Sequence, residues 1–201
     1  MAKAALPDYV DAMTKMRLLI LGAICVALLS GAPSFAAKKS PPPPNASPPA
    51  ADPGLAKSLG SVGSWTAYLA QNKTGRVCYL VGQPEKTDPS IKRKAVMAMV
   101  THRTEDNVSN VVSFDEGYPL NEDDDVIVEI GSDKFPLFAR DDTAWARTAE
   151  LDKTIVAALT KGKGATVKAS PKKGRGTTDT YALSGFSKAL ELIDKACDIK
   201  R

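Results

Sequence analysis

Short apolar segments dominate residues 62–140, and this pattern constrains the fold more than any other feature of the chain. Successive side chains of a strand point to opposite faces, so alternation of apolar and polar residues predicts strands with one buried face. Six segments show this alternation or the unbroken apolar run of a central strand: 65–69, 76–81, 95–101, 108–114, 126–130 and 134–139. Gly131-Ser132 predicts a hairpin between the last two, and Pro136 predicts that the returning strand lies at a sheet edge.

Helical periodicity replaces this alternation near the C-terminus. Residues 150–161 place apolar side chains four apart on one face, and residues 186–197 follow the i, i+3, i+4, i+7 spacing of an amphipathic helix, with Ser184 as its expected cap. Residues 165–168 and 178–183 between them predict two more strands. We therefore expect a mainly β domain, either a sandwich or a strongly curved antiparallel sheet, with one or two helices packed on it, including a C-terminal helix.

Residues 1–36 have the order of an export signal. Lys15 and Arg17 precede the uncharged run 18–29, and Ser34-Phe35-Ala36 supplies small residues for cleavage between Ala36 and Ala37. A retained membrane anchor is the weaker alternative, because a spanning helix needs ~20 apolar residues. Met16 is an alternative start. We expect the mature protein in the periplasm or secreted.

The next segment, residues 37–61, is rich in proline and predicts an extended linker, either a tether or a plain N-terminal spacer. Residues 62–201 then suffice for one globular domain. The chain's formal net charge of +4, from 27 basic and 23 acidic residues, is too balanced to indicate a nucleic-acid-binding protein. Membrane contact is expected to be peripheral at most. We expect a monomer, because Pro136 and neighbouring charges discourage edge-to-edge pairing.

Cys78 and Cys197 are the two cysteines that remain after removal of the signal. In an oxidising compartment they are expected to form a disulfide that joins an early strand to the last helix. The alternative is a pair of buried free thiols. No Cys-x-x-Cys spacing indicates a redox pair.

The chain resembles the invasion-associated locus B family of exported bacterial proteins. The similarity covers essentially the whole globular part, and its most specific segment runs from Asp179 through Tyr181, Leu183 and Gly185-Phe186 to Cys197. The resemblance implies a mainly β protein of a Gram-negative bacterium, periplasmic or secreted and linked in some pathogens to host-cell entry. It implies no established enzymatic activity.

Catalytic, metal and cofactor signals are weak. His102 is the only histidine, no Gly-x-Ser-x-Gly elbow accompanies it, and one histidine with two bonded cysteines cannot supply a zinc site. The acidic run 122–125 lacks the ligand spacing of a calcium loop, so it predicts a solvated turn. No cofactor is expected.

One basic segment has two interpretations, a soluble turn surface or an exposed patch that attracts anionic glycans, lipid headgroups or an acidic partner. Its residues are Lys161, Lys163, Lys168, Lys172, Lys173 and Arg175.

Three functions remain open. The preferred one is a non-catalytic exported binding or accessory protein, whose partner is an unknown protein, glycan or envelope component. The second is an envelope-maintenance or stress protein of the periplasm. The third is an enzyme with an unrecognised site, built on His102.

Overall fold

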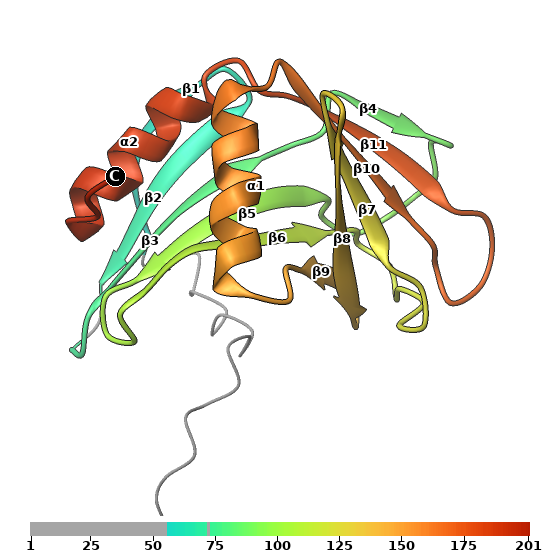
Figure 1. Ribbon diagram of the computed structural model, residues 1–201, viewed down its shortest axis with the longest axis horizontal. Coiled ribbons are helices and arrows are strands. Elements are labelled where there is room, and N and C mark those ends of the chain that lie inside the picture. Colours follow the sequence, from blue (N-terminus) through green and yellow to red (C-terminus); the bar gives the residue numbers. More distant parts are fainter. Residues whose placement is uncertain (1–55, 72) are drawn as a thin grey trace, which may run out of the picture. The chain divides into compact units, whose positions relative to one another are not determined.

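The computed structural model describes residues 56–71 and 73–201 (Figure 1). The predicted signal peptide, its cleavage site and the proline-rich stretch before residue 56 lie outside these residues. The described part forms an 11-stranded antiparallel sheet with two helices, which confirms the predicted fold class. Neither described helix is long and apolar enough to cross a membrane.

The helices are α1 (Ala149–Lys161) and α2 (Phe186–Cys197). The strands are β1 (Lys57–Val62), β2 (Trp65–Gln71), β3 (Arg76–Gly82), β4 (Lys86–Asp88), β5 (Met97–Arg103), β6 (Val108–Asp115), β7 (Val126–Ile130), β8 (Asp133–Arg140), β9 (Thr143–Trp145), β10 (Gly164–Ala169) and β11 (Thr177–Ala182).

The sheet consists of two halves joined by the short strand β9. Its order is β1-β2-β3-β5-β6-β9-β8-β7-β10-β11-β4. Helix α2 packs on β1, β2, β3 and β5, whereas α1 packs on β6 and on α2. In Figure 1, α1 crosses in front of β5 and β6, and α2 lies over β1 and β2 at the left. One face of the first half is therefore covered by the helices.

Three strands were not predicted: β1, β4 and β9, so nine strands precede α1 rather than six. β4 and β9 have only three residues each, which is too few for alternation to appear in the sequence. All of β1 except Val62 lies in the segment 37–61, for which the sequence predicts a linker, so the folded domain begins before residue 62. Its Ser and Gly residues gave no strand signal.

Trp65 connects the two halves of the sheet. Its indole Nε1 donates to the carbonyl oxygen of Ala182 at the end of β11 at 2.8 Å, and its ring makes an edge contact with Phe186, with 4.9 Å between centroids. Gly82 lies opposite Trp65 in the neighbouring strand, and a Cβ at Gly82 would lie 2.5 Å from the indole. The bare Gly82 backbone thus gives the indole room to reach the C-terminal part of the chain.

Helix α2 begins differently from the prediction, because its N-cap is Gly185 rather than Ser184, with no side-chain capping bond. Gly185 has a φ of 91°, in the left-handed region that glycine adopts without strain. A Cβ there would lie 2.3 Å from the carbonyl oxygen of Val62. The Gly-Phe pair of the predicted family motif therefore has a packing role: Gly185 permits close approach to β1, and Phe186 contacts Trp65.

The expectation that Pro136 marks an edge strand is only partly right. β8 lies inside the sheet, between β7 and β9. However, it pairs with β7 from Asp133 to Leu137 and with β9 only from Phe138 to Arg140. Within the described residues, the side of Asp133–Leu137 opposite β7 has no strand partner, and Pro136 lies in this open stretch.

Candidate functional site

Cys78 and Cys197 form the predicted disulfide, with 6.0 Å between their Cα atoms. Cys78 lies on the face of β3 that α2 covers, and Cys197 ends α2. Both residues are buried. The bond therefore ties the C-terminal helix to the third strand across 119 positions of sequence.

His102 lies beside this disulfide, because it pairs with Cys78 in the β3–β5 register. Its Nδ1 accepts a hydrogen bond from the backbone N–H of Asn110 at 3.0 Å, so the ring proton is on Nε2, which donates to Asp194 at 2.9 Å. Arg201 in turn donates to both carboxylate oxygens of Asp194 and to the side-chain oxygen of Asn110. Both ring nitrogens are engaged and the ring is fully buried. His102 thus fastens α2 to the sheet and has no nitrogen free to act as a general base.

Asp194 is the acidic partner in this network. Burial alone would raise the pKa of its carboxyl group, but the hydrogen bonds from His102 and Arg201 and the charge of Arg201 outweigh burial and lower that pKa. The carboxylate form is therefore favoured at the end of α2.

A second buried cluster surrounds Arg93, in the segment between β4 and β5. Its guanidinium makes two hydrogen bonds to Asp179, at 2.5 and 2.8 Å, and one to the Glu116 carboxylate at 3.2 Å. Arg93 also lies over the Tyr118 ring, 5.6 Å from its centroid. Burial, followed by the charge of Asp179, raises the pKa of Glu116 to about 8, and burial raises the pKa of Tyr181 as well. One cation thus serves two buried carboxyl groups, which fixes the 89–96 segment to β11.

Perturbed groups of this kind often mark functional sites. Here the Arg93 side chain is only 3% exposed and both acidic side chains are fully buried. A ligand from solvent does not reach these atoms in the observed arrangement. We therefore interpret the Arg93 cluster as structural.

Asp152 carries a testable pH dependence. It lies in the first turn of α1, and its carboxylate accepts the N–H of Val112 in β6 at 2.8 Å. Burial raises its pKa to about 7, although that hydrogen bond acts in the opposite direction. A folded-state pKa above the unfolded value means that the stabilising contribution is present below about pH 4 and is lost as the pH rises towards about 7.

We expect Asp152→Asn to remove this part of the pH dependence, because the amide oxygen still accepts from Val112 but does not titrate. Urea denaturation at several pH values measures the free energy of unfolding of both proteins. As the pH rises from about 4 to about 8, the value for wild type relative to the variant should fall by about 1.4 kcal/mol for each pH unit by which folding raises the pKa of Asp152. A constant difference between the two proteins from about pH 4 to about pH 8 would contradict the assignment. The decrease of the free energy of unfolding with pH that is due to Glu116 should persist in both proteins.

The charged segments singled out in the sequence lie at the surface. The acidic run 122–125 forms a turn before β7, in which Glu122 meets Lys172 and Asp125 meets Arg147. In the basic segment, Lys168 pairs with Glu129, while Lys161 and Lys163 lie at one end of β10. Lys172, Lys173 and Arg175 belong to the loop at the other end. The segment is thus divided by the length of a strand, and the anion patch stays a prediction. Among the described residues, no three His, Cys, Asp or Glu side chains are grouped to hold a metal ion.

Two hollows are candidates for ligand binding. The smaller, about 250 Å³, lies at the end of α2 and is lined by Arg76, Arg103 and Cys197 among others. Arg76 is engaged by the carbonyl oxygen of Ala196 and by Asp198, and Arg103 is engaged by Asp106. Each of these cations is already paired with a carboxylate, although the buried Nη1 of Arg103 has no hydrogen-bond partner among the described residues, so we rank this hollow as the weaker candidate.

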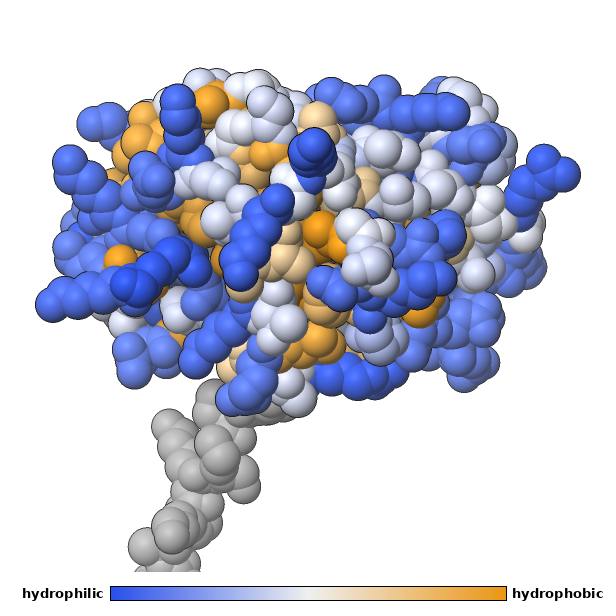
Figure 2. Space-filling view, turned by 45° about the horizontal axis from the view of Figure 1, so that its top comes forward, coloured by the Kyte–Doolittle hydropathy of each residue, from blue (hydrophilic) through white to orange (hydrophobic). Residues whose placement is uncertain are grey.

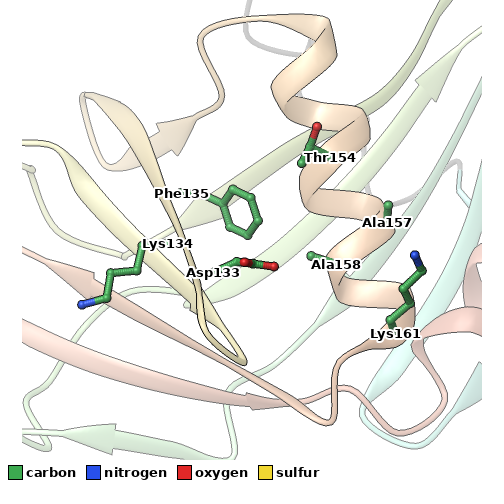
Figure 3. A pocket seen from close by; sticks show the side chains of 7 residues that line it. All are labelled: Asp133, Lys134, Phe135, Thr154, Ala157, Ala158 and Lys161. Atoms are coloured by element: carbon green, nitrogen blue, oxygen red, sulfur yellow. The ribbon is translucent and has the colours of Figure 1, made fainter.

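The larger hollow, about 400 Å³, is a groove between α1 and the β7–β8 hairpin, which we call the α1–β8 groove. Phe135 points from β8 towards the helix, and Ala158 lies on the side of the helix that faces it, while Ala157, which also lines the groove, lies on the outer side of the helix (Figure 3). Asp133, Lys134, Thr154 and Lys161 complete the lining. The Lys134 side chain points away from α1 and pairs with Glu129 at 3.1 Å.

The walls of the α1–β8 groove are mostly apolar or small, whereas the Asp133 carboxylate points into it towards Ala158 and the side chains of Lys134 and Lys161 point away from it. Figure 2 likewise shows apolar atoms at the surface in the middle of the face it presents, between hydrophilic side chains. Specific binding sites commonly combine an apolar floor with a few polar groups that fix orientation. The α1–β8 groove is therefore our candidate functional site.

The sequence does not predict this groove. Its residues come from a helix and a strand that are separated in the chain and that do not pair. One signal was available: Pro136 indicated an unpaired stretch of β8, which is the stretch beside the groove.

Comparison with known proteins agrees with the resemblance found in the sequence. The model of the family described as Invasion associated locus B (IalB) protein matches residues 65–194, and the chain belongs to this family. No curated protein and no solved structure matches the chain.

Proposed function

We propose that this member of the IalB family is an exported, non-catalytic binding protein that engages its partner through the α1–β8 groove. The partner belongs to the bacterial envelope or to the surface of a host cell. Support for export comes from the family, from the order of residues in 1–36 and from the disulfide, which suits an oxidising compartment. Periplasm and secretion are both compatible with these observations.

The observation that carries the binding role is the groove itself, an accessible hollow of about 400 Å³ on a domain whose C-terminal helix is fixed by a disulfide and a buried hydrogen-bond network. A rigid scaffold lowers the entropy lost when a partner is bound. The engagement of both His102 nitrogens argues against the alternative of an enzyme that uses this residue as a base.

Filling the groove should weaken binding of the partner. Ala157 is exposed on α1 and lines the groove, so Ala157→Arg places a long charged side chain across it without disturbing the core. Thr160→Arg is the matched control, because Thr160 is exposed on the same helix but does not line the groove. We expect Ala157→Arg to weaken binding by about tenfold or more, and Thr160→Arg to leave it nearly unchanged.

The measurement is binding of the labelled mature protein to envelope fractions and to intact host cells, for wild type and both variants. Equal binding by wild type and Ala157→Arg would exclude the groove as the site. Fractionation of the native cells, with N-terminal sequencing of the mature protein, tests export separately. An unprocessed chain in the cytoplasm would refute that part of the proposal.

A further inference from the structure

The open stretch of β8 beside the groove presents backbone groups in a definite pattern. Ile130 and Asp133 close a two-residue hairpin in which Gly131 has a φ of 62°. A closing pair of this kind exchanges both of its hydrogen bonds, and hydrogen-bonded pairs alternate with non-bonded ones along an antiparallel ladder. Phe135 therefore bonds to β7, whereas Lys134 and Pro136 direct their backbone groups away from β7.

Pro136 is consistent with this register, because it has no N–H and would leave a gap in the ladder if it faced β7. The open edge thus offers three groups: the N–H and C=O of Lys134 and the C=O of Pro136. No described strand uses them. They form the beginning of an unused β-ladder.

Strand β9 shows how this edge accepts a strand. It pairs antiparallel with Phe138–Arg140 of β8, and after Trp145 the chain leaves the sheet and turns into α1. The position next to Asp133–Leu137, where a longer β9 would continue, is left open. A longer β9 would also run beside β6, where the N–H of Val112 already donates to Asp152, so an added strand needs to pair only with β8.

A strand placed in this position would direct every second side chain over the α1–β8 groove, because alternate residues of a strand face the same side. Those side chains would meet Phe135, Ala157 and Ala158, which are apolar or small, and the Asp133 carboxylate at the hairpin end of the groove. The backbone would supply the hydrogen bonds and the groove would select the side chains. This combination is the physical basis of peptide recognition by strand addition.

We propose that the α1–β8 groove binds an extended peptide segment of a partner protein, which adds to β8 antiparallel as a continuation of β9. The proposal rests on the proposed function and specifies its partner as a polypeptide in extended conformation. Its groove-facing residues are apolar, and the residue opposite Lys134 is not proline, because it must donate an N–H to the Lys134 carbonyl oxygen.

The test uses the disulfide-bonded mature protein and a display library of random peptides of about ten residues, the upper range of strand lengths. Selected peptides are titrated by fluorescence anisotropy against wild type, Lys134→Pro and Lys134→Ala. Lys134→Pro removes the outward N–H without touching the ladder to β7, whereas Lys134→Ala keeps the backbone and removes the side chain. We expect binding to weaken by about tenfold or more for Lys134→Pro and by less than about twofold for Lys134→Ala.

A second arm keeps the protein unchanged. A selected peptide that is N-methylated at the residue opposite Lys134 should lose affinity as the Lys134→Pro variant does, and one methylated at the next residue should not. The proposal would be overturned if the protein variants and the methylated peptides all bound with equal affinity. It would also be overturned if the library yielded no peptide whose binding Ala157→Arg weakens. If Ala157→Arg abolishes partner binding while Lys134→Pro and N-methylation have no effect, the binding function stands and strand addition is wrong.

Discussion

Replacing both Cys78 and Cys197 with alanine is expected to lower the free energy of unfolding by about 4–5 kcal/mol, the loss that loop entropy predicts for so long a closed loop. The reason lies mainly in the unfolded chain, which gains freedom once the bond between β3 and α2 is absent. Because a single domain is stable by only about 5–15 kcal/mol, the expected loss amounts to between about a third and nearly all of its stability. Urea denaturation of the oxidised protein and of the double variant measures the difference.

A reducing agent provides the control. The mature chain is expected to contain no cysteine other than these two, so the reagent should destabilise wild type by a similar amount and leave the double variant unchanged. Equal unfolding curves for wild type with and without reductant would contradict the prediction. In the reduced protein, the network of His102, Asp194 and Arg201 still joins α2 to the sheet, together with the apolar packing of the helix and its contacts with Arg76.

The strands that the sequence predicts correctly are those in which the physical signal is local. β3, β5 and β7 alternate or run apolar over five or more residues, because their side chains pack on a core that is the same along the whole strand. β4 and β9 owe their strand geometry to neighbours that pair with them. Their sequences, Lys-Thr-Asp and Thr-Ala-Trp, have no preference strong enough to show this in isolation.

The start of α2 shows a second limit. Ser184 is a good capping residue by local rules, but the close approach of β1 requires a residue without a Cβ at the cap itself. Gly185 satisfies that requirement. A tertiary contact between Val62 and Gly185 therefore decides a feature that local propensity assigns to the serine.

The Arg93 cluster could not be predicted from the sequence, because it too depends on tertiary contacts. Arg93, Glu116 and Asp179 are far apart in the chain, and each alone looks like an ordinary surface residue. The disulfide could be predicted because compartment and cysteine number restrict the pairing to one choice. No comparable rule pairs one arginine with two of the chain's 23 acidic residues.

Arg93→Met is expected to destabilise the protein by about 3–5 kcal/mol at neutral pH, as is typical when one partner of a buried ion pair is removed. Methionine fills much of the volume, so the loss reports the two carboxyl groups left in an apolar site without a cation. The free energy of unfolding of wild type and variant, measured side by side, gives the value. The triple variant Arg93→Met, Glu116→Gln, Asp179→Asn is the control and should recover much of the loss, because no buried charge remains.

The pH dependence of this loss separates charge from packing. Burial already raises the pKa of Glu116 to about 8 in the presence of Arg93, and the Arg93 charge lowers that pKa. Removing Arg93 must raise it further, so the folded variant keeps this proton above about pH 8, where folded wild type releases it. The contribution of Glu116 to the stability of the variant relative to wild type is therefore constant up to about pH 8 and falls as the pH rises above that value. A loss of equal size at neutral pH and at about pH 9 would mean that Arg93 acts through its packing, and that Glu116 does not depend on its charge.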